Sequence, residues 1–233
     1  MDVSLLLIIL LVGAIATFLS GDKWASKTAL VFSLAAFGAS LYLLSLYNAG
    51  QNINFIARWI SVPNISLSFK ADGLALALVL LTTALTPLIL FSSFGNSYDK
   101  SRNFYGLVML MVFAMAGTFL SDDGFLYYIF WEIALIPIYF IALIWGNGNP
   151  QSRRKAVVKF FIYTFAGSLF MLVSFIYLYL RAGSFLWADL TSVELTAREQ
   201  FWIFLGFFMA YAIKIPLIPF HTWQAKVYQK APA

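Results

Sequence analysis

The chain has 233 residues, of which 62% are hydrophobic and only 11% are charged. A soluble domain carries roughly a quarter charged residues, so the composition excludes an ordinary soluble fold and indicates an integral membrane protein. The net charge of +5 comes mostly from short loops between apolar segments, which fits the positive-inside rule better than nucleic-acid binding.

The sequence lacks the residues that most protein-bound redox centres need. It contains no cysteine, which excludes disulfides, thiolate metal sites and cysteine-ligated Fe–S clusters within the chain. The one histidine, His221, excludes a bis-histidine haem. We therefore expect no cofactor or metal in this chain, and we expect any redox chemistry to take place in a partner.

Seven apolar segments are long enough to cross a bilayer, because a spanning helix needs about 20 apolar residues. They are Val3–Leu19, Thr28–Tyr47, Leu74–Phe91, Phe104–Leu120, Phe125–Trp145, Ala156–Leu180 and Phe201–Phe220. None alternates like a barrel strand, so the sequence predicts an all-α membrane fold. Before the first segment there is no basic region, so we expect it to stay in the membrane rather than be cleaved as a signal peptide.

Basic residues predict the orientation of the chain. Lys23, Lys100 and Arg153 represent the odd-numbered loops, which are richer in lysine and arginine than the even-numbered ones. The positive-inside rule then places the N-terminus outside and residue 233 inside.

The loop at 48–71 is longer than the other connections. Its apolar residues alternate with polar ones on both sides of Val62-Pro63-Asn64, which has the composition of a turn. This pattern predicts a small external hairpin, and an irregular interfacial loop is the alternative. Asp72, just after the loop, is expected to cap the third helix.

Glu132 lies inside the fifth apolar segment, shortly before Pro137. This proline would free the carbonyl of Ile133 if the helix continued through it. Ionisable residues inside a span are costly and are functional by default. Two interpretations stay open: Glu132 carries ions, or it is a buried neutral acid or a member of a structural ion pair.

The stretch AYAIKIPLIPFHTW places Lys214 inside the last apolar segment. Pro216 and Pro219 each remove a backbone donor, so in a helix they would free the carbonyls of Ala212 and Ile215. We therefore expect a helix broken near Lys214–Pro219, with the lysine beside two free carbonyls. Such a break is tolerated where it faces protein or water rather than lipid.

Glu132 and Lys214 are the two ionisable residues well inside the predicted spans. A nearby acid favours the charged form of the lysine, and withdrawal of that acid favours release of the proton. The two residues thus suggest a proton-transfer couple, and a static ion pair is the alternative. At 1.5 Å per residue their predicted depths differ by roughly 9 Å, so spacing alone does not establish contact.

Lys159 follows the basic cluster Arg153-Arg154-Lys155 by one helical turn. Its side chain either snorkels back to the lipid headgroups or feeds protons towards hydroxyls deeper in the same segment. Those hydroxyls belong to Tyr163, Thr164 and Ser168, and such groups also join neighbouring helices in membranes.

Four stretches occur in a distinctive order along the chain. They are KADGLALALVLLTTALTP, FWEIALIPIYFIALIWG, RKAVVKFFIYTFAGSL and AYAIKIPLIPFHTW. In order and spacing they resemble the antiporter-like subunits, which are the proton-pumping membrane subunits of respiratory complex I and its relatives. The resemblance implies about fourteen helices in two inverted repeats, of which this chain would hold the first half. Residues 1–92 would form three N-terminal helices and residues 104–233 the first, incomplete repeat.

The resemblance implies roles for individual residues. Glu132 resembles the fifth-helix glutamate and Lys214 the lysine of the discontinuous seventh helix, which form a couple in the family. His221 resembles a histidine on the hydrated central axis, where it would relay protons onward. Lys159 matches no motif position. The family pattern Leu-Pro-Asp-Ala-His is replaced by Gln224-Ala225-Lys226-Val227-Tyr228, so the roles of that acid and second histidine do not transfer.

The resemblance also implies a function. The chain would be a proton-translocating membrane subunit of an NADH–quinone oxidoreductase in the bacterial inner membrane, and part of an enzyme only as such a subunit. NADH, FMN, Fe–S clusters and quinone would belong to partner subunits, and sibling antiporter-like subunits and lipid would surround the chain. The alternatives are a subunit of a multi-subunit cation/proton antiporter or membrane-bound hydrogenase, and a structural membrane scaffold.

Overall fold

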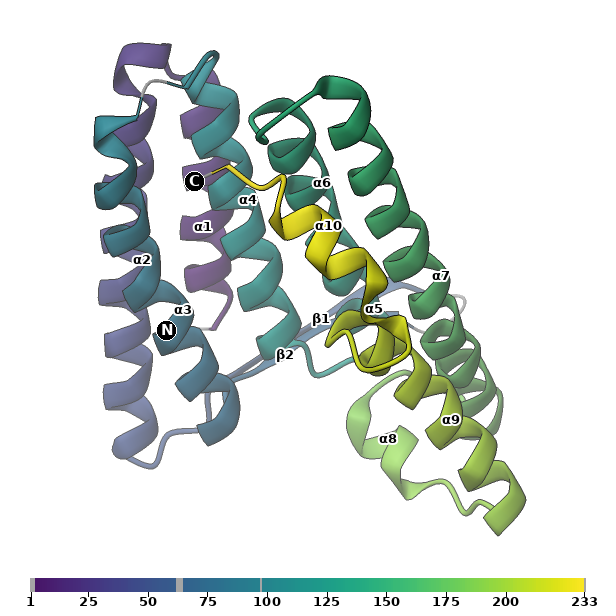
Figure 1. Cartoon of the computed structure of the whole chain (residues 1–233). Coiled ribbons are helices and arrows are strands. Elements are labelled where there is room, and N and C mark those ends of the chain that lie inside the picture. The colour runs from purple at the N-terminus through teal and green to yellow at the C-terminus, as the bar shows by residue number, and fades with distance from the viewer. Residues whose placement is uncertain (1–2, 62–64, 97, 233) are drawn as a thin grey trace. The chain divides into compact units, whose positions relative to one another are not determined.

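A computed structural model describes residues 3–61, 65–96 and 98–232 (Figure 1). Within these residues, five helical segments are long and apolar enough to cross a bilayer. They are α2 (Asp22–Asn48), α3 (Gly73–Ser92) with η1 (Ser93–Gly95), α4 (Ser101–Leu120), α5 (Gly124–Ile133) with α6 (Leu135–Ile144), and α7 (Pro150–Ala182). The predicted all-α membrane fold is confirmed.

The first and last predicted spans differ from the other five. Helix α1 (Ser4–Leu19) is apolar but shorter. Helix α9 (Ala197–Lys214) ends at the lysine instead of continuing to Phe220, and the 3-10 turn η2 (Phe220–Trp223) and helix α10 (Gln224–Tyr228) follow it. The last predicted span is therefore broken, as the two prolines indicated. A short helix α8 (Trp187–Ser192) precedes α9.

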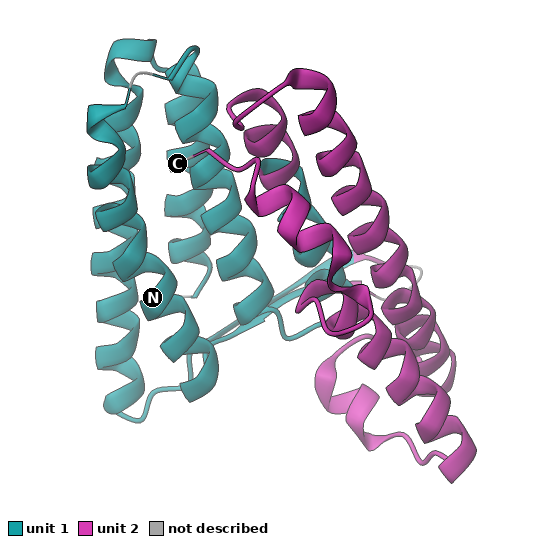
Figure 2. Cartoon of the chain, in the orientation of Figure 1, with its two compact units in different colours: residues 1–59, 66–137 teal, residues 60–65, 138–233 magenta. Residues whose placement is uncertain are grey.

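The chain falls into two compact units (Figure 2). Unit 1 comprises residues 1–59 and 66–137, and unit 2 comprises residues 60–65 and 138–233. In unit 1, helices α1 to α4 pack against one another and α5 packs against α4. A buried contact between the hydroxyls of Ser40 and Thr83, 2.8 Å apart, joins α2 to α3.

Two strands form in the long loop where the alternating pattern predicted a hairpin. Strands β1 (Asn54–Ile60) and β2 (Ile65–Lys70) pair in a two-stranded sheet, and the amide of Ala71 donates to the carbonyl of Ile53 at 2.9 Å. The predicted turn at Val62-Pro63-Asn64 lies outside the described residues. Asp72 accepts from the amide of Ala75 at 2.8 Å, which confirms the predicted cap of α3.

The start of α5 is fixed to strand β2 by the carboxyl of Asp123. This fully buried side chain accepts from the amides of Phe125 at 2.9 Å and Leu126 at 3.0 Å, and from the amide of Ser66 at 3.4 Å. Burial raises the pKa of Asp123, although the three backbone donors act in the opposite direction. The cap therefore sets the position of the helix that carries Glu132.

Unit 2 is organised around the packing of α7 against α9. Small residues allow the two backbones to approach, as is common in membrane bundles. A Cβ added at Gly206 of α9 would lie 2.1 Å from the Ser174 hydroxyl and 2.9 Å from the Phe170 carbonyl oxygen, and one at Gly167 of α7 would lie 2.9 Å from Ile213. The glycines thus determine how close Lys214, at the end of α9, lies to α7.

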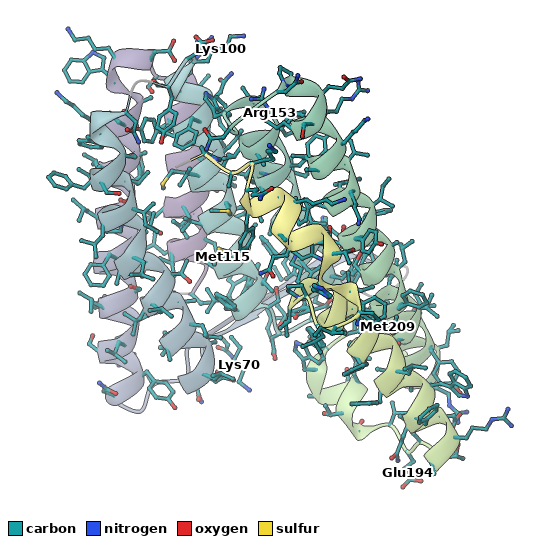
Figure 3. The ribbon with its side chains drawn as sticks, viewed as in Figure 1. Lys70, Lys100, Met115, Arg153, Glu194 and Met209 are labelled. Atoms are coloured by element: carbon teal, nitrogen blue, oxygen red, sulfur yellow. The ribbon has the colours of Figure 1, made fainter. Side chains whose placement is uncertain are left out.

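Polar contacts around Glu199 join the end of α7 to the start of α9. The side chains of Thr196 and Glu199 form a capping box at the start of α9, and Arg181 of α7 makes an ion pair with Glu199 at 2.9 Å. Tyr177 also donates to this carboxylate. Figure 3 shows Arg153 and Glu194 at opposite ends of unit 2, so its basic and acidic loops are well separated.

We expect Gly206→Ala to destabilise the protein by about 1–3 kcal/mol, because a methyl group must displace Ser174 or the backbone of α7. Thermal unfolding in detergent measures this change. Gly38→Ala in α2 is the matched control, since nothing lies within 4 Å of a Cβ added there. Equal melting temperatures for the two variants would contradict the close approach of α7 and α9.

Candidate functional site

Lys214 is the last residue of α9, and its Nζ atom is buried. The amide of Ile215 still donates to the carbonyl of Tyr211 at 2.8 Å, after which the chain turns. The break therefore begins directly after the lysine. Pro216 cannot donate to the backbone, which accounts for the position of the break.

The two carbonyls that the prolines were expected to free are not both left open. The carbonyl of Ala212 accepts from the amide of Leu217 at 2.8 Å, which replaces the bond that Pro216 removes. The prediction of a free Ala212 carbonyl beside Lys214 is therefore wrong. Because α9 ends at Lys214, Pro219 lies beyond the helix and does not interrupt its hydrogen-bond ladder.

Trp223, which follows the break in the chain, contacts the last turn of α9. Its indole Nε1 donates to the carbonyl of Ile213 at 3.0 Å, and its ring packs on Phe160 of α7 with centroids 4.9 Å apart. The tryptophan is 5% exposed, so this bond is shielded from water. A carbonyl in the last turn of α9 thus finds a side-chain donor, as a helix end in a membrane requires.

Glu132 lies next to a much smaller interruption. It is the last residue but one of α5, which ends at Ile133. Ala134 keeps helical backbone angles and donates to the Phe130 carbonyl at 3.1 Å before α6 begins at Leu135, so the interruption is confined to one residue. Pro137 falls in the first turn of α6, where a missing amide does no harm. The Oε1 atom of Glu132 is buried.

The two breaks place opposite charges at the same kind of helix end. The carbonyl end of a helix carries partial negative charge, which attracts a cation and repels an anion by about 0.3–1 kcal/mol each. Lys214 and Glu132 both lie in the last turn of their helices.

Lys159 meets the segment that carries His221. Its Nζ donates to the Thr222 hydroxyl at 3.0 Å and lies 5.1 Å from the centre of the Tyr163 ring. The side chain thus reaches from α7 to η2 instead of only extending along its own helix. His221 is exposed in η2, next to Thr222.

The structure therefore brings three of the four candidate residues into unit 2: Lys159, Lys214 and His221. Glu132 belongs to unit 1, and its coupling to Lys214 stays a prediction. The hydroxyls of Thr164 and Ser168 donate to carbonyls of their own helix at 2.8 Å. Among the described residues, no cluster of acidic, histidine or cysteine side chains could hold a metal ion.

Two functional contacts were not predicted from the sequence. Trp223 as a donor to Ile213, and Thr222 as the partner of Lys159, both depend on how the chain folds back after Pro219. The sequence contained a signal for the contact between Trp223 and Ile213. Trp223 is an aromatic donor a few residues beyond two prolines in an apolar segment, where a carbonyl needed a partner.

These features define a multi-pass helical membrane protein with ionisable residues at helix breaks. Residues 121–233 match the family described as NADH:quinone oxidoreductase/Mrp antiporter, TM. The chain is 32% identical, over 98% of its length, to F(420)H(2) dehydrogenase subunit M of Methanosarcina mazei, of which it covers 48%. It is 34% identical, over 91% of its length, to NADH-quinone oxidoreductase subunit M of Rickettsia prowazekii, of which it covers 43%.

A solved structure gives the same assignment. A chain of respiratory complex I from Thermus thermophilus superimposes with a TM-score of 0.87 at 27% identity, over 97% of this chain and 47% of that one. Residues 121–233 therefore match this membrane domain family, and the chain is similar along most of its length to relatives named subunit M. It spans about half the length of the curated relatives that it matches.

We expect Trp223→Phe to lower the free energy of unfolding by about 1–3 kcal/mol, because the Ile213 carbonyl loses its indole donor while the ring contact with Phe160 is kept. Thermal unfolding in detergent measures the loss. Trp202→Phe on the exposed face of α9 makes the same chemical change and should be neutral. A neutral Trp223→Phe variant would show that this hydrogen bond does not hold the break.

Proposed function

We propose that the chain belongs to a proton-translocating membrane subunit of a quinone-reducing respiratory complex, in which Glu132 and Lys214 form the proton-transfer couple. The observation that carries this proposal is the placement of both residues, with buried side-chain polar atoms, directly before an interruption of their helices. A helix break lets a buried charge change its surroundings without unfolding a whole span. The relatives named NADH-quinone oxidoreductase subunit M support the same reading.

The proposed mechanism assigns one task to each residue. Redox chemistry in partner subunits changes the distance between Glu132 and Lys214. When the acid is close, it stabilises the protonated lysine, and when it withdraws, Lys214 releases its proton. His221 accepts the proton on the onward side. Lys159, held by Thr222, is a secondary candidate for supplying protons to this end of unit 2.

The proposal places all redox groups outside this chain. The NADH site, FMN, Fe–S clusters and quinone would belong to partner subunits, and sibling antiporter-like subunits would flank this one. The relative from Methanosarcina mazei is named for F(420)H(2) instead of NADH, which fits a membrane subunit that serves different electron donors. Residues 1–92 would form the N-terminal helices and residues 104–233 part of the first inverted repeat.

We expect Glu132→Gln and Lys214→Met each to reduce proton pumping by at least about tenfold, since a positioned proton-transfer group contributes 10²–10⁴-fold to its step. Pumping is measured with a pH-sensitive dye in liposomes that contain the complete complex, during quinone reduction. Glu194→Gln and Lys100→Met make the same changes at exposed residues and should leave pumping intact.

Three results would contradict parts of this proposal. Normal pumping in both variants would remove Glu132 and Lys214 from the mechanism. A Glu132→Leu/Lys214→Leu double variant that assembles and pumps normally would favour the structural scaffold. Sodium-dependent proton exchange by a purified complex without flavin or Fe–S subunits would favour the antiporter alternative.

We also propose that the protein lies in the bacterial inner membrane with its N-terminus outside. The absence of cysteine allows a direct test, because a single introduced cysteine has no background within the chain. A membrane-impermeant maleimide should label Glu194→Cys in intact cells and Lys100→Cys only after permeabilisation. The reverse pattern would invert the proposed orientation.

A further inference from the structure

A cavity of about 680 Å³ lies in unit 2 between the start of α7 and α10. Four lysines line it: Lys155 and Lys159 from α7, Lys226 from α10, and Lys230 just after α10. The remaining lining groups include the neutral side chains of Asn149 and Gln229, and no acidic residue of the described chain lines the cavity. The cavity therefore concentrates positive charge.

The four lysines have no carboxylate within the described part of the chain to balance them. None of them forms an ion pair with another described residue, and Lys159 donates to the neutral hydroxyl of Thr222. Like charges around a common cavity repel one another, and an anion in the cavity would offset that repulsion. The first turn of α7 adds the partial positive charge of a helix N-terminus.

Hydrogen bonds fix the backbone that carries the cavity's walls. The amide of Asn147 donates to the carbonyl of Lys230 at 2.8 Å, and the Asn147 side chain donates to the carbonyl of Ala231 at 2.8 Å. On the opposite side, Lys159 is held by Thr222. The segments that carry these lysines are thus held in place by hydrogen bonds.

We propose that this cavity binds an anionic phosphate group. Lysine is a compact point charge that suits phosphate, and four lysines suit an anion with more than one charged oxygen. The proposal is independent of the Glu132–Lys214 couple.

Two sources share this chemistry: the headgroup of an anionic phospholipid and free phosphate. The surface below the cavity favours the lipid. Ile162, Phe165 and Leu169 continue along α7 with 58%, 41% and 41% exposure, which would leave an apolar path for acyl chains beneath a bound headgroup. Basic pockets at the ends of membrane helices bind anionic headgroups in this way.

The test titrates the full-length protein, purified in a neutral detergent, with three probes: palmitoyl-oleoyl phosphatidylglycerol, the matching phosphatidylcholine and inorganic phosphate. Native mass spectrometry counts the bound lipids, and calorimetry follows phosphate. We expect phosphatidylglycerol to bind more tightly than phosphatidylcholine. Lys226→Gln/Lys230→Gln should weaken phosphatidylglycerol binding on the order of tenfold.

The control variant Lys23→Gln/Lys27→Gln removes two exposed lysines at the same spacing near the start of α2, and it should bind phosphatidylglycerol like the wild type. Lys226→Arg/Lys230→Arg keeps the positive charges and should bind phosphatidylglycerol like the wild type. This result would show that the Gln variant binds weakly because it lost charge and not because it misfolded. If phosphate rather than lipid binding depends on Lys226 and Lys230, the site takes free phosphate. Equal losses in both Gln variants, or equal binding of both lipids, would overturn the proposal.

Discussion

The hydrocarbon interior of a membrane offers no water to backbone groups, and this constraint explains the details of the broken helix. Pro216 removes one amide from α9, and the chain replaces that bond with the amide of Leu217 and adds the indole of Trp223. The break can persist because its carbonyls are satisfied by neighbours. The same solution allows Lys214, whose Nζ atom is buried, to lie at the end of a helix.

Both interruptions have an ionisable residue directly before them. Glu132 lies in the last turn of α5, and Lys214 is the last residue of α9. The opposite end of each helix is capped. Asp123 caps the start of α5, and the Thr196–Glu199 capping box caps the start of α9.

Sequence patterns predicted the elements well and their tertiary contacts poorly. Local signals such as Asp72 before an apolar run, or Pro216 after Lys214, act within one or two turns and are visible in the chain. The partner of the Ala212 carbonyl was missed because it depends on the turn that follows the proline. The lysine-lined cavity was missed because α10 lies some seventy residues from the start of α7, and only the fold brings them together.

Helix α7 is longer than a bilayer requires. Its 33 residues span about 50 Å, whereas the hydrocarbon core is about 30 Å thick. The surplus lets the helix tilt or shift along the membrane normal while apolar residues still fill the core. We therefore expect the protein to tolerate membranes of different thickness, with the depth of the lysine-bearing end, and not the packing of α7 on α9, absorbing the difference.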